Sequence, residues 1–525
     1  MLQPILIDGA WRQAEATGTF TAFNPATGAP LPEQYPISGL ADIEQALLAA
    51  QQAVKKMRFV PVEAIAHFLE TFAGAIEARS EALVEMAAQE TGLPGVPRLR
   101  NVELPRTTDQ LRQAAAAVRE RSWCQATLDT THNIRAKYSP LNGPVVVLGP
   151  SNFPFAFNSI AGGDFAAALA VGNPVIAKAH PGHPATTRLL AEAAFEALQR
   201  SSLPAGMVQM LYHMSQQDGL TLVSHPLVGA TAFVGSRAAG LRLKQAAEEA
   251  GKPIYVEMSS INPVVILPNA LEERLPQIVN EFCTSALSAT GQFCTNPGLV
   301  IMVAGPLSEQ FLERAASAFQ ATPPGFLFHE DSPRRLATAV TSLQQCNARV
   351  ITGGQQLEGP GYRFENTLLS VSGDHFLQQS SKLQEEAFGN VSLIVLASNQ
   401  AQLLEIIERL EGNLTGTIYD HSAGLDDPLY EELEPLLQAK VGRLLNNKMP
   451  TGVAVSPAMM HGGPFPASGH LGFTGVGIPA SLLRFAARRC YENIPTRHLP
   501  AELREKNPTG QTWRLIDGEW TQRDL

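Results

Sequence analysis

The chain has 525 residues, of which 45% are hydrophobic and 17% are charged, below the usual charged share of about 25%. This composition excludes general disorder, which requires few apolar residues and a high net charge. The formal net charge is −10 and there is no long basic run, so nucleic acid is not expected as a partner. Length allows roughly two to four domains.

Cysteine usage and the N-terminal segment indicate the compartment. The five cysteines form no CxxC pair, which predicts a chain that does not depend on disulfides. Residues 1–13 lack the basic residues of a secretory signal and include an acidic residue at position 8. No apolar run reaches the roughly 18 residues that a membrane helix needs. We therefore expect a cytoplasmic protein with no membrane partner.

The N-terminal part of the chain mixes loops and helices. The first forty residues are rich in Pro, Gly and Thr, which predicts hairpins and loops. Apolar residues at steps of three and four predict helix over residues 40–88 and again over 101–119. The segment NIRAKYSP, residues 133–140, is typical of an extended strand that stands apart from its neighbours.

From residue 145 onward, short apolar runs alternate with helical stretches. This alternation predicts βαβ units and a parallel sheet, and runs without polar residues suit strands that are covered on both faces. A second alternating region begins at residue 263. The sequence therefore predicts two α/β bodies that join near residues 259–263.

The segment ATGQFCTNPG, residues 289–298, surrounds Cys294 with Gly, Thr, Gln and Asn. A structural cysteine normally lies in an apolar helix or strand, whereas a thiolate nucleophile needs a polar, partly exposed setting. Cys294 is therefore a candidate nucleophile, with ordinary packing as the alternative. Cys283 lies in an apolar helical pattern, which predicts packing.

Two further residues follow predicted parallel strands, where α/β sheets place their ligand sites. Asn152, in GPSNFPFAF, could offer its side-chain amide to an oxyanion, or could only satisfy its own turn. Glu257, at the end of YVEM, could act as a general base, or could be a solvated strand end.

Three segments carry groups that suit a ribose or a phosphate. Lys178 ends the predicted strand PVIAKA, where its ammonium could hold a ribose or phosphate oxygen. The turn FVGSRAAG, residues 233–240, leads into a helix whose N-terminal amides could face a pyrophosphate, although G-x-G-x-x-G is absent. The segment EEAFGNV, residues 385–391, places two carboxylates before a Phe-Gly pair.

Taken together and in this order, the motifs NFP, KAH, FVGS, VEM, GQFCTNPG and EEAFGNV resemble the aldehyde dehydrogenase superfamily. The resemblance runs from FNPATG at residue 23 to about residue 473. It implies an α/β fold with two parallel-sheet domains and a small strand-built oligomerisation element, in a homodimer or homotetramer. The expected divisions are a cofactor-binding domain (1–130 and 143–260), a catalytic domain (261–470), and an oligomerisation element with a C-terminal arm (131–142 and 485–525).

The resemblance also implies roles for the site residues. Cys294 matches the nucleophile that forms a thiohemiacetal and then a thioester. Asn152, with the backbone N–H of Cys294, matches the oxyanion site, and Glu257 matches the base that activates water. Phe153 and Phe157 match the wall of the substrate tunnel. Five residues match cofactor-binding positions: Lys178, Gly235, Ser236, Glu386 and Phe388.

Several positions depart from the common pattern of the family. Where the family has E-L-G-G-K around the base, this chain has E-M-S-S-I, and where it has K-P-S-E, this chain has K-A-H-P. The carboxylate that often repels a 2′-phosphate is thus missing three residues after Lys178. We therefore expect NADP in preference to NAD, with His180 as a residue that could help to bind a phosphate.

These variants, together with HGGPFPAS, resemble a bacterial branch of α-ketoglutaric semialdehyde dehydrogenases and an NADP-dependent fatty aldehyde dehydrogenase. In that branch His461 matches a histidine near the nucleophile, with a surface loop histidine as the alternative. A semialdehyde that carries a carboxylate needs a cation in its tunnel. Arg106 and Arg112, about two helical turns apart, could share the face that borders the tunnel, or both could be ordinary surface arginines.

The expected reaction is oxidation of 2,5-dioxopentanoate to 2-oxoglutarate, with a medium- or long-chain fatty aldehyde as the alternative substrate. No metal is expected. A cofactor-independent thiol esterase that uses Cys294, Glu257 and Asn152 is an alternative from another class. The retained dinucleotide residues argue against it, because a hydrolase needs no dinucleotide. A catalytically silent scaffold is a third alternative.

Overall fold

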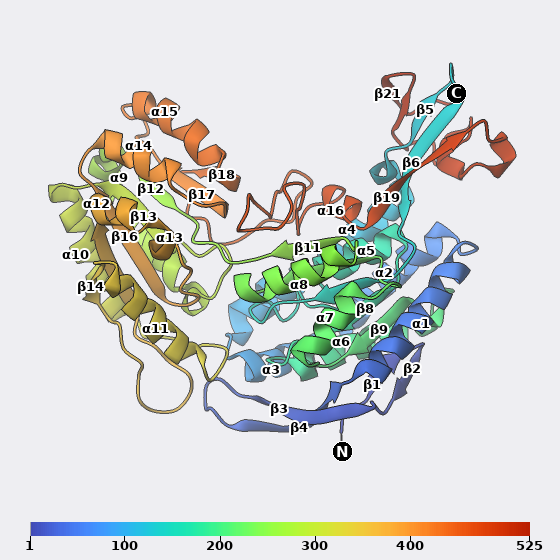
Figure 1. Cartoon of the computed structure of the whole chain (residues 1–525), viewed down its shortest axis with the longest axis horizontal. Coiled ribbons are helices and arrows are strands. Elements are labelled where there is room, and N and C mark those ends of the chain that lie inside the picture. The colour runs from blue at the N-terminus through green and yellow to red at the C-terminus, as the bar shows by residue number, and fades with distance from the viewer. Residues whose placement is uncertain (1) are drawn as a thin grey trace.

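Helices and strands alternate along most of the chain, and the computed structural model, which describes residues 2–525, arranges them in two α/β bodies and an arm (Figure 1). The arm projects from one side of the molecule and carries the C-terminus. None of the helices within residues 2–525 is both long and apolar enough to cross a membrane.

The first body is built on a seven-stranded sheet in the order β11-β10-β7-β8-β9-β1-β2. The five strands from β11 to β9 are parallel, as the continuous apolar runs predict, and the β1–β2 hairpin adds an antiparallel edge next to β9. The strands are β1 (Ile5–Ile7), β2 (Ala10–Arg12), β7 (Val145–Leu148), β8 (Val175–Lys178), β9 (Val208–Leu211), β10 (Ala230–Val234) and β11 (Ile254–Glu257). The helices between them are α5 (Gly163–Val171), α6 (Pro184–Gln199), α7 (Gln216–Ser224) and α8 (Arg237–Glu249).

Helices from the N-terminal part of the chain cover this body. The helix expected over residues 40–88 is three helices, because the chain breaks before Pro61 and again at Arg79. They are α1 (Leu40–Met57), α2 (Val62–Ala78) and α3 (Ser80–Thr91). A π-helical segment (Gly95–Glu103) precedes α4 (Leu104–Glu120). The paired strands β3 (Ala16–Phe23) and β4 (Pro30–Ser38) form a separate ribbon.

The second body has a sheet in the order β14-β15-β16-β13-β12-β17-β18, parallel except for the edge strand β14. Two strands, β15 and β18, are not expected from the apolar runs, because polar residues interrupt both. The strands are β12 (Val264–Ile266), β13 (Leu299–Val303), β14 (Arg349–Thr352), β15 (Thr367–Ser372), β16 (Val391–Ala397), β17 (Asn413–Tyr419) and β18 (Val441–Asn446). The helices are α9 (Pro268–Leu287), α10 (Pro306–Ala321), α11 (Ser332–Gln345), α12 (Gly373–Gln378), α13 (Ser380–Leu383), α14 (Gln400–Glu408) and α15 (Asp427–Gln438).

The arm is a five-stranded sheet in the order β19-β6-β5-β20-β21. Its strands are β5 (Thr127–Asp129), β6 (Ile134–Pro140), β19 (Ala486–Glu492), β20 (Arg514–Ile516) and β21 (Glu519–Thr521), and α16 (Ala480–Leu483) leads into it. The oligomerisation element was expected to begin at residue 131. Because β5 belongs to the sheet of the arm, the arm begins before that residue, at β5. The edge strand β19 pairs with β6 over its whole length.

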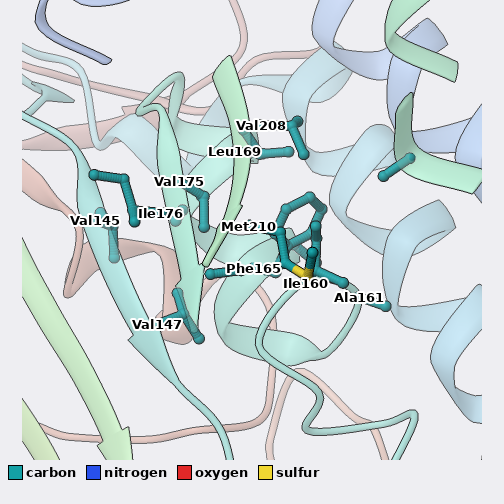
Figure 2. Close-up of a cluster of buried hydrophobic side chains, with 14 of the residues drawn as sticks. Val145, Val147, Ile160, Ala161, Phe165, Leu169, Val175, Ile176, Val208 and Met210 are labelled. Carbon is teal, nitrogen blue, oxygen red and sulfur yellow. The ribbon is translucent and has the colours of Figure 1, made fainter. Parts of the chain in front are cut away.

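Helix α5 closes the core of the first body. Figure 2 shows Phe165 and Leu169 of this helix beside the valines and isoleucine of β7 and β8, and both side chains have 0% exposure. The loop after β7, residues 149–162, leaves this packed layer toward the second body. Its starting point is therefore rigid, because interiors of this density leave no room for a strand to shift.

We expect Phe165→Ala to lower the free energy of unfolding by about 3–5 kcal/mol, because it removes a fully buried ring and leaves a cavity. The midpoint of urea denaturation measures the loss. Phe59→Ala is the matched control, because Phe59 is 87% exposed and should change the midpoint little. Equal midpoints for the two variants would contradict the packing described for α5.

Candidate active site

A cleft of about 400 Å³ lies where the two bodies face each other, and four functional candidates from four different loops line it. Asn152 follows β7, Glu257 is the last residue of β11, and Cys294 and Glu386 come shortly before β13 and β16. Residues far apart in the sequence thus meet at the edges of two sheets. Asn152 and Glu257 lie at the carboxyl ends of their strands, where open α/β sheets place ligands.

The backbone around Cys294 is held by one buried side chain, Asn262. Its Nδ2 donates to the carbonyl oxygens of Cys294 at 2.8 Å and of Asn296 at 2.9 Å. Asn262 has a left-handed φ of 49°, a conformation that asparagine tolerates better than most residues. Asn413 supports this turn in the same way, because its Oδ1 accepts from the backbone N–H of Asn262 at 3.1 Å.

The approach to Cys294 requires a glycine. Gly291 has a φ of 69°, and a Cβ at this position would lie 2.1 Å from the carbonyl oxygen of Gly389. Any side chain here would push apart the loops that carry Cys294 and Glu386. Gln292 continues the turn, and its carbonyl oxygen accepts a 3.0 Å hydrogen bond from Nδ2 of Asn152.

The loop that carries Asn152 is anchored by the carboxylate of Glu103, which is fully buried. Its Oε1 accepts from the backbone N–H groups of Phe155 and Ala156 at 2.8 and 3.0 Å. Arg98 pairs with the same carboxylate at 2.5 Å and donates to the backbone oxygen of Asn152 at 3.3 Å. The position of the Asn152 amide is therefore set by an ion pair outside the cleft.

Cys294 lies beside two side chains that can take its proton. Its Sγ is 3.7 Å from Nε2 of His461, and that nitrogen is 3.1 Å from Oε1 of Glu257. Glu257 and His461 are each only 1% exposed. Burial raises the pKa of the Cys294 thiol well above its usual value, the nearby Glu257 charge raises it further, and Arg106 opposes both. The thiol is therefore protonated at neutral pH and needs a base to become a nucleophile.

The expected cofactor residues lie along the same cleft, apart from Lys178. Gly235, Ser236, Glu386 and Phe388 all line it, and Ser236 caps the N-terminus of α8. Burial raises the pKa of Glu386 to about 7, although this carboxylate accepts hydrogen bonds from Ser259 and Ser260.

Lys178 ends β8 and is half-buried, and burial lowers its pKa to about 8. Burial also lowers the pKa of His180, the cleft residue two positions further on, well below its usual value. Nδ1 of His180 accepts from the backbone N–H of Gly182 at 3.1 Å. The proton of the neutral ring is therefore on Nε2, which can donate to a ligand.

A cluster of aromatic rings lies beside His461, and the guanidinium groups of Arg98 and Arg106 lie over it. Phe153 and Phe157 pack edge to face at 5.1 Å, and Phe157 lies 5.7 Å from the ring of His461. The guanidinium of Arg106 lies over these two phenylalanine rings, at 5.8 and 5.1 Å. Nε and Nη2 of Arg106 are buried and have no hydrogen-bond partner among residues 2–525. Arg106 is therefore a partly buried cation beside Phe153 and Phe157, without an ion-pair partner among residues 2–525.

The expectation for Arg112 is wrong. Its guanidinium makes two hydrogen bonds to Glu77, at 2.6 and 2.8 Å, on the outer surface. Arg106 and Arg112 are six positions apart (112 − 106), which is about 600° of helix and leaves them about 120° apart in direction. They cannot share a face.

Sequence reasoning missed several residues that shape the site. Asn262 and Asn413 act through backbone contacts that no motif reveals. Glu103 could have been found, because it directly precedes the helix of Arg106, and a glutamate in that position can accept hydrogen bonds from the backbone of a neighbouring loop.

Comparisons with known proteins agree on one family. Residues 11–464 match the model of the aldehyde dehydrogenase family. The chain is 39% identical to "Alpha-ketoglutaric semialdehyde dehydrogenase 2" of Azospirillum brasilense, over 98% of each protein. It is 37% identical to "Alpha-ketoglutaric semialdehyde dehydrogenase" of Acinetobacter baylyi, over 97% of each protein.

Solved structures show the same fold at lower identity. Lactaldehyde dehydrogenase from Escherichia coli superposes with a TM-score of 0.79 at 23% identity, covering 93% of this chain and 98% of that one. A 1-pyrroline-5-carboxylate dehydrogenase from Thermus with bound NAD superposes with a TM-score of 0.80 at 24% identity, covering 93% of this chain and 92% of that one.

The charges beside Cys294 predict opposite changes in its reactivity. Glu257→Gln removes a negative charge and should lower the pKa of the thiol, whereas Arg106→Gln removes a positive charge and should raise it. The pH at which alkylation by iodoacetamide is half-maximal should shift by about one unit in each direction. Measurements in a Cys490→Ser background avoid the exposed thiol. Glu385→Gln, at an exposed carboxylate nearby, is the control, and profiles that coincide would refute the arrangement.

Proposed function

The chain belongs to the aldehyde dehydrogenase family, and we propose that it oxidises α-ketoglutaric semialdehyde (2,5-dioxopentanoate) to 2-oxoglutarate with NADP as the preferred cofactor. Membership in the family makes the protein an NAD(P)-dependent oxidoreductase that acts on an aldehyde. The observation that carries the proposed substrate is Arg106, the partly buried cation beside Phe153 and Phe157 that has no ion-pair partner within the described residues.

A carboxylate on the substrate would complete the environment of Arg106. Removing a guanidinium from water costs several kcal/mol, and an anionic partner with good geometry compensates for much of this cost. Arg106 also presents two unused donor nitrogens, the arrangement with which arginine grips a carboxylate. The names of the Azospirillum and Acinetobacter relatives support a semialdehyde of this kind.

A fatty aldehyde fits this site less well. Its alkyl chain would pack against Phe153 and Phe157 but would leave Arg106 partly buried beside hydrocarbon. A thiol esterase is excluded by membership in the family, since that makes the protein an oxidoreductase.

The residues of this chain would divide the chemistry as follows. Cys294 attacks the aldehyde carbon and passes its proton to Glu257 or His461, which are within reach of the sulfur. Asn152 uses the Nδ2–H that does not bond to Gln292, together with the backbone N–H of Cys294, to stabilise the oxyanion of the thiohemiacetal. The bound nicotinamide supplies the hydride acceptor that turns this species into a thioester. The thiol proton passes from Glu257 or His461 to solvent, and Glu257 then takes a proton from the water that hydrolyses the thioester, which releases Cys294 as the thiolate.

The cleft contains groups that fit a dinucleotide. The N-terminus of α8 at Ser236 suits a pyrophosphate, and the buried carboxylate of Glu386 suits ribose hydroxyl groups. Lys178 would contact the other ribose, and Phe388 would pack beside the nicotinamide. The preference for NADP is supported by the neutral Pro181 where the family often has a carboxylate, and by the free Nε2–H of His180.

We also propose that the arm mediates assembly into a homodimer or homotetramer. Strand β19 is an edge strand with one unpaired side, so a second chain can extend the sheet. The five unpaired cysteines support a cytoplasmic location.

The proposed function is tested by steady-state kinetics at 340 nm with a panel of aldehydes and both cofactors. The panel consists of 2,5-dioxopentanoate, succinate semialdehyde, hexanal and decanal. We expect the highest kcat/KM for 2,5-dioxopentanoate with NADP. A higher value for decanal would favour the fatty aldehyde, and a higher value with NAD would refute the cofactor preference.

The role of Arg106 is tested by comparing kcat/KM for two substrates in the same variant. In Arg106→Gln, kcat/KM for 2,5-dioxopentanoate relative to hexanal should fall about 10- to 100-fold, the value of a charge-assisted hydrogen bond. The ratio cancels any effect on Cys294, since that effect is common to both aldehydes. Arg112→Gln, on the opposite side of the same helix, should leave the ratio unchanged. An unchanged ratio in Arg106→Gln would show that Arg106 does not recognise the substrate.

A further inference from the structure

Three chemically different donor groups converge at the wall of the cleft: Glu257, Cys294 and His461. One ligand atom from each, a carboxylate oxygen, the Sγ and an imidazole nitrogen, lie within 4.8 Å of one another. They come from the end of β11, the turn before β13 and the loop after β18. Tertiary structure alone brings them together.

This donor set matches the coordination chemistry of zinc. Thiolate, imidazole and carboxylate bind Zn²⁺ at about 2.3, 2.0–2.1 and 2.0–2.2 Å, which places the donors of a tetrahedral site about 3.3–3.6 Å apart. Here Sγ of Cys294 is 3.7 Å from Nε2 of His461, and that nitrogen is 3.1 Å from Oε1 of Glu257. Both distances need to change by only a few tenths of an ångström.

A second observation points to a cation at the same place. Both carboxylate oxygens of Glu257 are buried and have no hydrogen-bond partner within the described chain, residues 2–525. Their short contact with His461 therefore lacks the alignment of a hydrogen bond. A buried carboxylate without a hydrogen bond is costly, and a bound cation would compensate for that cost.

We propose that Glu257, Cys294 and His461 bind one thiophilic divalent cation, with Zn²⁺ as the best fit, and that the bound ion inhibits the enzyme. The thiol of Cys294 loses its proton to solvent as the S–Zn bond forms, and two negative ligands then neutralise the ion. The cleft opens on both Glu257 and Cys294, which gives the ion a path of entry. Inhibition follows because the metal occupies the sulfur lone pair that would attack an aldehyde, and only this consequence depends on the proposed function.

The experiment titrates the full-length, metal-stripped enzyme with Co²⁺, which takes the place of Zn²⁺ and is visible in absorbance. We expect one ion per chain, with a thiolate-to-cobalt charge-transfer band in the near ultraviolet and visible bands of tetrahedral intensity. Competition with Zn²⁺ should remove the bands. Zn²⁺ should also inhibit turnover of whichever aldehyde the enzyme oxidises fastest, and a chelator should restore it.

Variants assign the ligands. Cys294→Ser should abolish the charge-transfer band, and Glu257→Gln and His461→Gln should each weaken Co²⁺ binding at least about 10-fold, as loss of a metal ligand or its support does. Prior alkylation of the wild-type thiol tests Cys294 without any risk to folding. Cys490→Ser, at an exposed cysteine, should bind Co²⁺ as the wild type does.

Two results would overturn the proposal. One is a charge-transfer band that persists after Cys294 is alkylated, and the other is unchanged affinity in both Glu257→Gln and His461→Gln. Failure of the substrate panel would leave these spectra unaffected, because Co²⁺ binding is measured without aldehyde or dinucleotide.

Discussion

The site depends on the hydrogen bonds from Asn262 to the carbonyl oxygens of Cys294 and Asn296. Asn262 lies where the chain passes from the first sheet to the second, so these bonds attach the nucleophile loop to the join between the two bodies. Without them, two buried carbonyl groups would lack partners, at a cost of about 1–3 kcal/mol each. The distances from Cys294 to Asn152, Glu257 and His461 all follow from where this loop is held.

Several charged side chains lie close to the sulfur of Cys294. Because water screens them little there, each charge interacts strongly with the others. Glu257 is buried, Arg106 and Glu386 are partly buried, and each affects the pKa of Cys294. The protein thereby keeps its nucleophile protonated until a base acts on it. Two groups without partners underlie the two proposals. The carboxylate of an anionic aldehyde would pair with Arg106, and a thiophilic metal ion would pair with Glu257.

Local patterns predicted most of the fold. Each parallel strand of the first body is a short apolar run, and the helices between the strands repeat apolar residues at steps of three and four. They failed where polar residues interrupt the apolar run, as in β15 and β18, and where a proline or a turn divides a long helical pattern, as at Pro61. The candidate residues Cys294, Asn152 and Glu257 were each ambiguous alone. Their order along the chain made them specific, and the cleft brings all three to one place.

The sequence by itself determined the family, the two α/β bodies and the chemical identity of the reacting groups, because these depend on residue types and their order. Only the tertiary structure decided which arginine lies beside the aromatic rings of the site. Arg106 and Arg112 lie on one helix and look equivalent in the sequence, but the rotation between them sends one toward Phe157 and the other toward Glu77. The tertiary structure also decided between the two interpretations of His461, because it places this side chain against Cys294 and Glu257. Cys294 and His461 are 167 residues apart, and no local pattern encodes a contact over that separation.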